Sequence, residues 1–360
     1  THGKTTTSSL LAWILESADT DPSYLIGGLP SWNPRAFRLG RGPWMVIEGD
    51  EYNTAFFDRG PKFLHYRPHL FILGPVEYDH ADLYPSLDAV LTAFRAGAAQ
   101  VPKTGAVVVN AWSPHSLAAA RDATAPVLTV GPDETSDLVV GDWRPTPEGG
   151  TAELRWHGDR LELALPLAGA HNGQNAALAL AGALAIGVPA SRALQALSLF
   201  PGVARRMDVR GEASGILVVD DFAHHPTALG VTVAAARQRW PGRRIVIAFE
   251  PRSLTAARRD FGALYLESLS GADLVLVAAP FHADRLADDE VLDRETLASE
   301  LEGRGVRSLM PGTDDDPVEA LLPELRSGDV VLGCSSGSFD GFHARLLKAL
   351  EIDRKPVTVV

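Results

Sequence analysis

The sequence predicts an α/β protein with two domains, a P-loop domain followed by a Rossmann-like, doubly wound domain. The chain opens on Gly3-Lys4-Thr5 directly before an apolar-striped helix, which is the order found in phosphate-binding loops. From Gly215 onward, apolar strands alternate regularly with helical patterns, which is typical of a parallel sheet with helices on its faces. A chain of 360 residues can bury two such cores. We place the boundary at Arg206, giving domains of residues 1–206 and 207–360.

The first helix begins inside a phosphate loop. In a P-loop, backbone N–H groups and the helix N-terminus cradle phosphates, the lysine reaches the outer phosphates and the threonine hydroxyl ligates Mg²⁺. Lys4 and Thr5 are the residues for these roles here. The complete motif also has an earlier glycine preceded by a strand, which the printed residues do not include. From these residues alone, an ordinary helix start remains the alternative.

The rest of the first domain is predicted from short apolar runs and helical periodicity. Residues 22–43 are rich in Gly, Pro and aromatic residues and are expected to form a loop. The elements that follow are strands at 44–47 and 69–73, a helix at about 86–100, strands at 106–110 and 125–130, a hairpin at 151–166, and helices from 171 to about 187 and from 190 to 199. Acidic residues follow the first two strands, at the edge where an open α/β sheet binds ligands.

The second domain shows five apolar runs of strand length, each separated from the next by a helical pattern or a turn. Strands are expected at 216–219, 245–249, 274–278, 306–310 and 330–333, and helices near 227–239, 257–269, 291–303, 317–326 and 341–350. No internal repeat and no low-complexity run is present in the sequence.

The composition narrows the class of protein. The formal net charge of −12 argues against nucleic acid as a general partner. No apolar run is long enough to span a bilayer, and the first residues lack a signal-peptide pattern, so we expect a cytoplasmic protein without membrane insertion. The single cysteine, Cys334, fits a reducing compartment and is interpreted as a small buried residue rather than a nucleophile.

The segment after the second strand carries candidate metal ligands. Glu77, Asp79 and His80 follow residues 69–73 closely. Oxygen ligands at this position, together with Thr5, would suit Mg²⁺ that carries nucleotide phosphates. The alternative is that Asp79 or His80 caps the next helix.

A second polar cluster follows the first strand of the second domain. Asp220 and Asp221 stand beside His224 and His225 and precede a proline. Paired carboxylates and histidines could bind a metal, perform acid–base chemistry, or hold a ribose and a peptide. A helix-capping loop is the alternative.

Several further residues could bind anions. The guanidinium groups of Arg205, Arg206 and Arg252 suit phosphate or carboxylate, although most arginines are simply solvated. The turn at 335–338 follows the last strand and is either an anion-binding nest or an ordinary turn.

Read together and in order, these motifs resemble the ATP-dependent muramyl (Mur) ligases of cell-wall synthesis, in particular the branch that joins a murein tripeptide to UDP-N-acetylmuramate. The resemblance extends over essentially the whole chain. The matching blocks are THGKTTTSS at 1–9, IEGDEY at 47–52, TAFFD at 54–58, EYDHAD at 77–82, GAHN at 169–172 with Asn175, GVARR at 202–206, DDFAHHPT at 220–227, EPRS at 250–253 and the Gly-rich turn before Phe339.

The resemblance implies roles for particular residues. Lys4 would hold the β- and γ-phosphates, and Arg206 would contact the γ-phosphate from the second domain. The implied residues for each group are as follows: for the nucleotide Gly3, Lys4, Thr5, Thr6, His171, Asn172, Asn175, Arg206 and Asp221; for Mg²⁺ Thr5, Glu77 and His80; for the incoming amino acid or peptide His224, His225, Arg252 and Ser253; and for catalysis Lys4, Glu77 and Arg206.

The chemistry that the resemblance implies is activation of a carboxylate by ATP. An acyl phosphate forms, a peptide amine attacks it and inorganic phosphate leaves, with Mg²⁺, Lys4 and Arg206 stabilising the transferring phosphoryl group. The implied cofactors are ATP and Mg²⁺, the substrates are UDP-N-acetylmuramate and a murein tripeptide, and the implied process is peptidoglycan recycling. A monomer or weak dimer is expected.

The sequence departs from the family pattern in three places. The N-terminal domain that binds the UDP-sugar in the family is not among the printed residues, so we expect residues 1–360 alone to bind the sugar nucleotide poorly. Gly74-Pro75 stands where the family usually has asparagine. Ala96, beside Arg95, stands where the family has a histidine tied to a second metal. We therefore do not expect a second metal to bind, unless Arg95 supplies the missing positive charge directly.

Two alternatives follow from these departures. One is a related ligase that adds a single amino acid or a glutamate tail. The other is a non-catalytic nucleotide-binding protein descended from such ligases.

Overall fold

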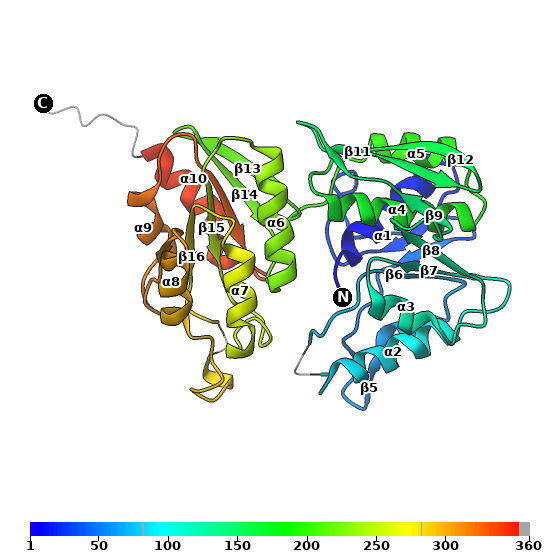
Figure 1. The fold of residues 1–360 in the computed structure, drawn as a ribbon, viewed down its shortest axis with the longest axis horizontal. Coiled ribbons are helices and arrows are strands. Elements are labelled where there is room, and N and C mark those ends of the chain that lie inside the picture. The colour runs from blue at the N-terminus through cyan, green and yellow to red at the C-terminus, as the bar shows by residue number, and fades with distance from the viewer. Residues whose placement is uncertain (81–82, 282, 353–360) are drawn as a thin grey trace, which may run out of the picture. The chain divides into compact units, whose positions relative to one another are not determined.

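The structure, a computed structural model, describes residues 1–80, 83–281 and 283–352. The chain divides into two compact units, Thr1–Ala204 and Arg205–Val360 (Figure 1). The predicted boundary lies two residues further along the chain.

The first unit contains a seven-stranded sheet and a separate three-stranded sheet. The strand order of the larger sheet is β10-β11-β9-β8-β7-β6, with β12 on the far side of β11. The pairs from β6 to β9 are parallel, whereas β10, β11 and β12 pair antiparallel. These strands are β6 (Leu70–Leu73), β7 (Ala106–Asn110), β8 (Val127–Gly131), β9 (Leu138–Val140), β10 (Arg144–Pro145), β11 (Gly150–Trp156) and β12 (Asp159–Leu165).

The three-stranded sheet has the order β2-β1-β3. Its strands are β1 (Ser23–Leu25), β2 (Phe37–Arg38) and β3 (Met45–Ile47), and β3 pairs parallel to β1. A small hairpin, β4 (Asn53–Ala55) and β5 (Asp58–Pro61), follows and leads into a 3₁₀ turn at Lys62–His65.

Helices cover both faces of the larger sheet in Figure 1, with α1 (Lys4–Ser17), α4 (Ala170–Ala185) and α5 (Ala190–Ser198) on one face and α2 (Leu87–Ala99) and α3 (Pro114–Ala120) on the other. Strand β7 shows why both faces are covered. Val108 packs in the core that contains α1 and α4, whereas Val107 and Val109 pack in the core that contains α2. Successive side chains of a strand point to opposite faces, so β7 is apolar throughout.

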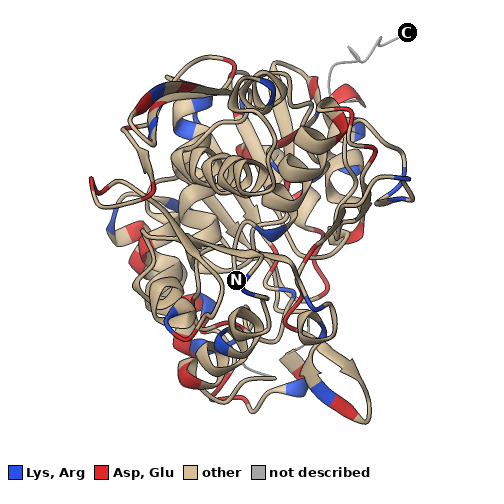
Figure 2. Cartoon of the chain, turned by 90° about the vertical axis from the view of Figure 1, so that its right-hand side faces the viewer, with Lys and Arg blue, Asp and Glu red and all other residues tan. Residues whose placement is uncertain are grey.

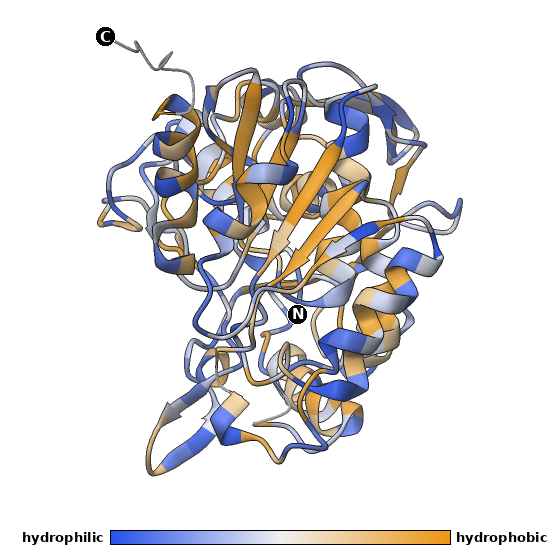
Figure 3. Cartoon of the chain, turned by 90° about the vertical axis from the view of Figure 1, so that its left-hand side faces the viewer, coloured by the Kyte–Doolittle hydropathy of each residue, from blue (hydrophilic) through white to orange (hydrophobic). Residues whose placement is uncertain are grey.

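The second unit is a six-stranded sheet in the order β13-β14-β18-β15-β16-β17. All pairs are parallel except β13 with β14. The strands are β13 (Asp208–Ala213), β14 (Ile216–Asp221), β15 (Ile245–Phe249), β16 (Leu274–Val277), β17 (Arg307–Leu309) and β18 (Val330–Cys334). The helices are α6 (Pro226–Arg239), α7 (Gly262–Leu269), α8 (Arg294–Gly303), α9 (Pro317–Leu321) and α10 (Phe342–Ile352). Figure 3 shows hydrophobic strands among helices of mixed hydropathy.

The structure confirms the predicted α/β class and corrects several elements. Residues 22–43 are not only a loop, because β1 and β2 form within them. The helix expected at 257–269 begins only at Gly262, after a 3₁₀ turn, and the one expected at 317–326 ends at Leu321. Strand β13 was not predicted.

Charged residues of both signs are spread over the chain. Figure 2 shows basic and acidic residues interspersed along helices and loops. Among the residues that the structure describes, no helix is both long enough and apolar enough to cross a membrane.

Candidate functional site

The phosphate loop is held by Gly3 and Asn175. Gly3 has φ +72°, in the left-handed region that favours glycine, and it immediately precedes α1. A Cβ added to Gly3 would lie 2.2 Å from Oδ1 of Asn175 on α4. The Thr7 hydroxyl donates to the same Oδ1 atom at 3.3 Å. The backbone bend and the contact with Asn175 therefore both require glycine, and α4 fixes the position of the loop.

Lys4 is paired with Glu51, from the segment after β3. The Lys4 ammonium group donates to a carboxylate oxygen of Glu51, whose side chain is only 3% exposed. The amine of Thr1 lies 3.4 Å from the other oxygen. Burial alone would raise the pKa of Glu51, but these two cations lower it to about 2. Burial alone would lower the pKa of Lys4, but the neighbouring Glu51 carboxylate raises it.

Thr5 is positioned by Glu48, which directly follows β3. The buried Thr5 hydroxyl donates to Oε1 of Glu48 at 2.9 Å, and the Gly27 amide donates to Oε2 at 2.6 Å. Close packing supports this arrangement, because a Cβ on Gly28 would lie 2.7 Å from the Thr5 methyl group. One carboxylate thus connects the phosphate loop to the segment after β1.

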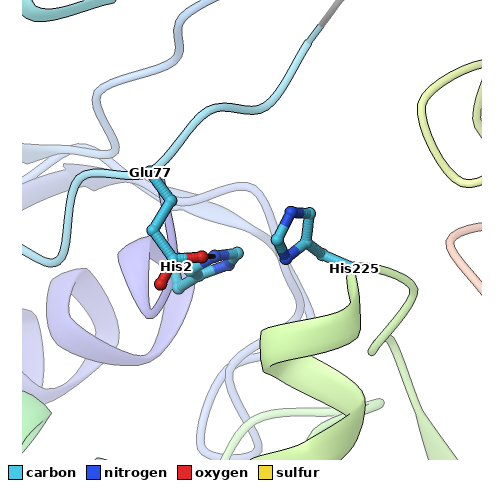
Figure 4. A group of neighbouring side chains, drawn as sticks. All are labelled: His2, Glu77 and His225. Atoms are coloured by element: carbon cyan, nitrogen blue, oxygen red, sulfur yellow. Dashed lines mark hydrogen bonds and ion pairs between the residues drawn. The ribbon is translucent and has the colours of Figure 1, made fainter. Parts of the chain in front are cut away.

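Glu77 lies against the first two residues of the chain. The Glu77 amide donates to the Thr1 hydroxyl at 3.1 Å, and a carboxylate oxygen of Glu77 lies 3.1 Å from Nε2 of His2. Figure 4 shows the His2 ring and the Glu77 carboxylate side by side. The Thr1 amine also donates to the Pro75 carbonyl at 2.8 Å, so the segment after β6 and the phosphate loop form one network.

His80 belongs to the neighbourhood of Glu51. Its Nε2 lies 4.0 Å from Glu51 and 3.8 Å from Asp79, and its ring packs edge-on against Tyr52. Tyr84 donates its hydroxyl to the Glu51 carbonyl at 2.9 Å, and burial beside this acidic segment raises the pKa of Tyr84 to about 12. The last two residues of the block at 77–82, Ala81 and Asp82, lie outside the described residues.

The oxygen donors around the loop suit Mg²⁺. The Thr5 hydroxyl and the carboxylates of Glu48 and Glu77 all lie on segments that contact the phosphate loop. Mg²⁺ prefers such hard oxygen ligands and usually takes one or two carboxylates together with substrate phosphates. The donor set therefore fits this ion, whereas His80 as a further ligand stays a prediction.

The first turn of α4 holds the other predicted nucleotide residues of this unit. Asn172 and Asn175 are buried, and Asn175 Nδ2 donates to Asn172 Oδ1 at 3.3 Å. Asn172 in turn donates to the Ala168 carbonyl at 2.8 Å. His171, which directly precedes Asn172 along the chain, is partly exposed. The structure brings Asn175 to the phosphate loop, while the nucleotide contacts of His171 and Asn172 remain predictions.

Ala96, at the position tied to a second metal in the family, is exposed on α2, whereas its two neighbours along the chain contact other segments. Arg95 donates its Nε to the Ala118 carbonyl at 3.4 Å. A Cβ on Gly97 would lie 2.9 Å from Phe63, so α2 is closely packed here. The Arg95 side chain thus contacts the end of α3.

In the second unit, Arg205 and Arg206 both contact Phe222. The guanidinium carbons lie 5.1 Å and 4.8 Å from the centre of the Phe222 ring, within the range of cation–π attraction. Arg205 also donates to the carbonyls of Ser335 and Gly337, at 2.7 and 2.6 Å. Arg205 therefore connects the start of this unit to residues 335–338 after β18. The sequence analysis left open whether these residues form an anion-binding nest or an ordinary turn.

The buried Asp221 carboxylate holds several segments of this unit together through hydrogen bonds. Its carboxylate accepts the amides of Met207 and Ala223, each at 2.8 Å, and the Thr232 hydroxyl at 3.4 Å. Burial raises the pKa of Asp221, and Arg206 and the two amides oppose this effect. A ribose hydroxyl at Asp221 would have to share oxygens that already accept these bonds.

The two histidines after β14 lead into α6. His225 caps α6, with its Nδ1 accepting the Thr227 amide at 3.3 Å, and it lies at the start of that helix in Figure 4. The ring of His224 contacts the Phe222 carbonyl at 3.0 Å through Nδ1. The Tyr265 hydroxyl donates to the His224 carbonyl at 2.9 Å. Helix capping, the alternative from the sequence, therefore accounts for His225, and its peptide contact remains a prediction.

Arg252 lies between an acid and an aromatic ring. Its Nη1 donates to Glu250 at 3.4 Å, and its guanidinium carbon lies 3.9 Å from the centre of the Phe281 ring. A Cβ on Gly337 would lie 2.0 Å from Arg252 Nε, so only glycine leaves room for this side chain. The Ser253 hydroxyl accepts the Ala256 amide at 3.0 Å.

Cys334 is buried, and burial raises the pKa of its thiol. Both facts agree with its interpretation as a small packing residue.

Two residues that the structure places at the loop were not predicted to have a role there. Glu48 holds Thr5, and Glu51 pairs with Lys4. The available signal was the acidic run that follows residues 44–47, together with its expected place at the carboxyl end of a strand.

Comparison with known proteins places both units in one family. Residues 1–183 match the Mur ligase middle domain, and residues 205–337 match the Mur ligase glutamate ligase domain. The chain is 34% identical to UDP-N-acetylmuramate–L-alanyl-γ-D-glutamyl-meso-2,6-diaminoheptandioate ligase of Escherichia coli (strain K12), over 97% of this chain and 74% of the relative. It is 32% identical to UDP-N-acetylmuramate–L-alanine ligase of Desulfitobacterium hafniense (strain Y51), over 94% and 73%. The chain thus spans about three quarters of these relatives.

Solved structures agree with this placement. A murein peptide ligase from Psychrobacter arcticus 273-4 is 31% identical, with a TM-score of 0.70 over 98% of this chain and 76% of that chain. A MurF ligase from Thermotoga maritima in complex with ADP has a TM-score of 0.72 at 18% identity, over 99% of this chain and 79% of that chain. The second likeness is one of fold alone.

Proposed function

This chain belongs to the Mur ligase family, and from that premise we propose that it joins the amine of a murein tripeptide to the carboxylate of UDP-N-acetylmuramate, in peptidoglycan recycling. Members of the family are ATP-dependent ligases that form amide bonds. The observation that supports this substrate pair best is the 34% identity with the Escherichia coli ligase of that name over 97% of this chain. The cytoplasm as location, and a monomer or weak dimer, remain predictions.

The proposed reaction has two steps. A carboxylate oxygen of the sugar nucleotide takes the γ-phosphoryl group of ATP, and ADP leaves. The peptide amine then attacks the acyl carbon, inorganic phosphate leaves and the amine loses a proton. During transfer, negative charge is spread over the oxygens of the phosphoryl group. Cations and dipoles that are held in position around it therefore account for most of the rate acceleration.

The residues of the first unit would hold the phosphate end of ATP. Gly3 and the following amides form the loop, Thr6 supports it from the buried face of α1, and Lys4 contacts the β- and γ-phosphates after leaving Glu51. Thr5 and Glu77 would hold Mg²⁺, which when bound neutralises phosphate charge. The pairing of Lys4 with Glu51 supports this role, because a buried carboxylate keeps Lys4 charged and close to the loop.

The remaining nucleotide contacts are proposed from the family resemblance. His171, Asn172 and Asn175 would form the adenine and ribose side of the site, with Asp221 at the ribose. Arg206 would supply the γ-phosphate contact from the second unit.

The residues of the second unit would hold the peptide. Arg252 is the strongest candidate for a peptide carboxylate, because Glu250 and Phe281 fix its guanidinium group and leave it partly exposed. His224 and His225 follow β14, Ser253 follows β15, and all three are proposed as further contacts.

A second candidate amine is L-alanine. It is favoured by the 32% identity with the Desulfitobacterium hafniense ligase of that name, which differs little from the value for the tripeptide ligase. Both candidates share UDP-N-acetylmuramate and ATP, so only the amine distinguishes them.

The test is release of ADP and phosphate with a panel of amines, using this chain joined to a UDP-sugar-binding domain of the family, because residues 1–360 alone are expected to bind the sugar nucleotide poorly. We expect release only when UDP-N-acetylmuramate and the tripeptide are both present, with L-alanine at least about tenfold poorer in kcat/KM. Faster turnover with L-alanine would transfer the assignment to the second candidate. Tight binding of Mg-ATP without turnover by any amine would instead favour the non-catalytic alternative.

A further inference from the structure

Arg294, the first residue of α8, bridges the ends of two strands in the second unit. Its Nη1 atom donates to the Val277 carbonyl at 3.1 Å and to the Pro311 carbonyl at 2.9 Å. Val277 is the last residue of β16, and Pro311 follows the end of β17 closely. These two bonds fix the guanidinium group at the carboxyl edge of the sheet, which is the edge where open α/β sheets bind ligands.

The guanidinium group of Arg294 has no ion pair with any residue that the structure describes. Burial lowers the pKa of Arg294, and among these residues only the exposed carboxylate of Glu295, next along the chain, opposes this effect. Arg252, by contrast, has the carboxylate of Glu250 at 3.4 Å. A bound anion would stabilise the partly buried charge of Arg294, because an opposite charge nearby favours the charged form.

One side of this guanidinium group is left for a ligand. Both bonds to the strand ends start from Nη1. The N–H groups of Nε and Nη2 make no hydrogen bond to the described part of the chain. Together they form a planar fork that matches the two oxygens of a carboxylate. The side chain is partly exposed, so the group that fits Arg294 best is a carboxylate.

Arg252 and Arg294 lie at the ends of neighbouring strands. Phe249, the last residue of β15, pairs with Val277 in the register of the sheet, and Arg252 follows Phe249 closely. Phe281, which follows β16, lies 3.9 Å from the guanidinium carbon of Arg252. Because neighbouring strands are about 4.8 Å apart, the two arginines stand on the same edge of the sheet, one strand spacing from each other.

The proposed peptide carries carboxylates at more than one position. In an L-alanyl-γ-D-glutamyl-diaminoheptanedioate peptide, the γ linkage leaves the α-carboxylate of the glutamyl residue free, and the last residue carries further carboxylates. One residue of an extended chain spans about 3.3 Å or more, which is comparable to the spacing between strands. A peptide with its glutamyl carboxylate at Arg252 can therefore bring its last residue to the next strand end.

We propose that Arg294 is a specificity-determining residue, and that its Nε and Nη2 atoms bind a carboxylate of the last residue of the peptide while Arg252 binds the glutamyl carboxylate. This assignment rests on the proposed function, since L-alanine has no second carboxylate. Arg294 therefore adds binding only for the longer amine. A site built to pair a polar group discriminates strongly against a ligand that leaves the group unpaired.

The test combines a change in the protein with a change in the peptide. The protein change is Arg294→Gln, in this chain joined to a UDP-sugar-binding domain of the family. The peptide change places amides where the last residue has carboxylates. The measurement is kcat/KM for each peptide and for L-alanine at saturating ATP and UDP-N-acetylmuramate, with thermal unfolding to check the fold. Arg307→Gln is the control, because Arg307 is an exposed residue of β17 that pairs with Glu324.

We expect the unchanged protein to use the amidated peptide about tenfold or more less well than the tripeptide, because a charge-assisted bidentate pair is lost. Arg294→Gln should use the two peptides about equally, with the loss in KM for the tripeptide and no change in KM for ATP. Its kcat/KM for L-alanine should equal that of the unchanged protein. A purely structural role of Arg294 would lower kcat/KM for all amines alike.

The outcomes separate this assignment from the proposed function. Equal discrimination between the two peptides in Arg294→Gln and in the unchanged protein would overturn the role of Arg294 and leave the proposed function standing, as would equal use of both peptides by the unchanged protein. Turnover with L-alanine alone, or with no amine, would overturn both. If Arg294→Gln does not fold, Arg294→Lys decides: lysine keeps the charge without the fork, so discrimination should fall, and full discrimination would overturn the role of Arg294.

Discussion

The Thr5 hydroxyl donates to a carboxylate oxygen of Glu48 at 2.9 Å, and this bond connects the phosphate loop to the end of β3. Glu48 also accepts the Gly27 amide at 2.6 Å. A hydroxyl that is to ligate a metal must be held in one orientation, and Glu48 provides that constraint. Groups that orient metal ligands usually matter nearly as much as the ligands themselves.

We therefore expect Glu48→Gln to raise the Mg²⁺ concentration needed for half-maximal ADP release and to lower kcat/KM by about 10- to 100-fold. The measurement is a Mg²⁺ titration of turnover. Glu16→Gln is the matched control, since Glu16 accepts a bond from Trp32 outside the loop. An unchanged Mg²⁺ requirement in Glu48→Gln would remove Glu48 from the metal site.

Lys4→Ala should abolish ATP turnover while the fold survives, because Lys4 lies in a loop-proximal first turn and its side chain is 26% exposed. The loss of one charged donor to the transferring phosphoryl group is expected to reduce kcat by at least about 10²- to 10³-fold. Circular dichroism checks the fold, and Lys62→Ala, at an exposed ion pair with Asp50, serves as the control. Full turnover in Lys4→Ala would refute the phosphate-loop assignment.

Gly3→Ala should lose nucleotide binding, whereas Gly187→Ala should keep it. Both glycines have positive φ, at +72° and +87°, so each alanine variant should cost about 1 kcal/mol of stability from backbone strain. Only at Gly3 does the added Cβ meet a neighbour, Asn175 at 2.2 Å, while Gly187 has open space. Calorimetry with Mg-ATP and chemical unfolding of both variants separate the two effects. Equal nucleotide affinities would contradict the role of Gly3.

Glu51 should make stability depend on acid pH. Its pKa falls from 4.5 in the unfolded chain to about 2 in the folded one, so its contribution is fully present above pH 4.5 and is lost as the pH falls towards 2. The size of this contribution is at most about 3 kcal/mol. Urea unfolding between pH 2 and 5 measures it by comparison with Glu51→Gln, which should show a shallower decline. Parallel curves would mean that Glu51 is not ionised in the folded chain.

Arg252→Lys should weaken peptide use more than ATP use. Lysine keeps the charge but not the planar group that lies over Phe281 and reaches Glu250, so KM for the tripeptide should rise by about tenfold with KM for ATP unchanged. Arg304→Lys, at an exposed pair with Glu267, is the matched control. A rise confined to the ATP KM would assign Arg252 to the nucleotide instead.

Local chemistry made much of this protein predictable. The order Gly3-Lys4-Thr5 before an apolar helix specifies a loop and a helix within a few residues, and both are present. The regular alternation after Gly215 likewise gave the parallel sheet of the second unit, because buried parallel strands are apolar throughout.

The missed features depend on contacts between distant segments. Strand β13 has the sequence DVRGEA, which lacks apolar alternation because it is an exposed edge strand. Strands β1 and β2 are two or three residues long and lie among glycines and prolines. Glu51 could be seen as acidic, but its pairing with Lys4 depends on folding across 47 residues.

The packing of α4 has a consequence for how this protein can vary. Residues 176–181 of this helix are all alanine or leucine and are completely buried, and the helix packs against α1. Asn175, on the same helix, abuts Gly3. A bulkier side chain in this stretch would push the two helices apart and displace the loop with them. Substitutions in this alanine-rich helix, whether they arise in evolution or in the laboratory, should therefore reduce turnover as readily as they reduce stability.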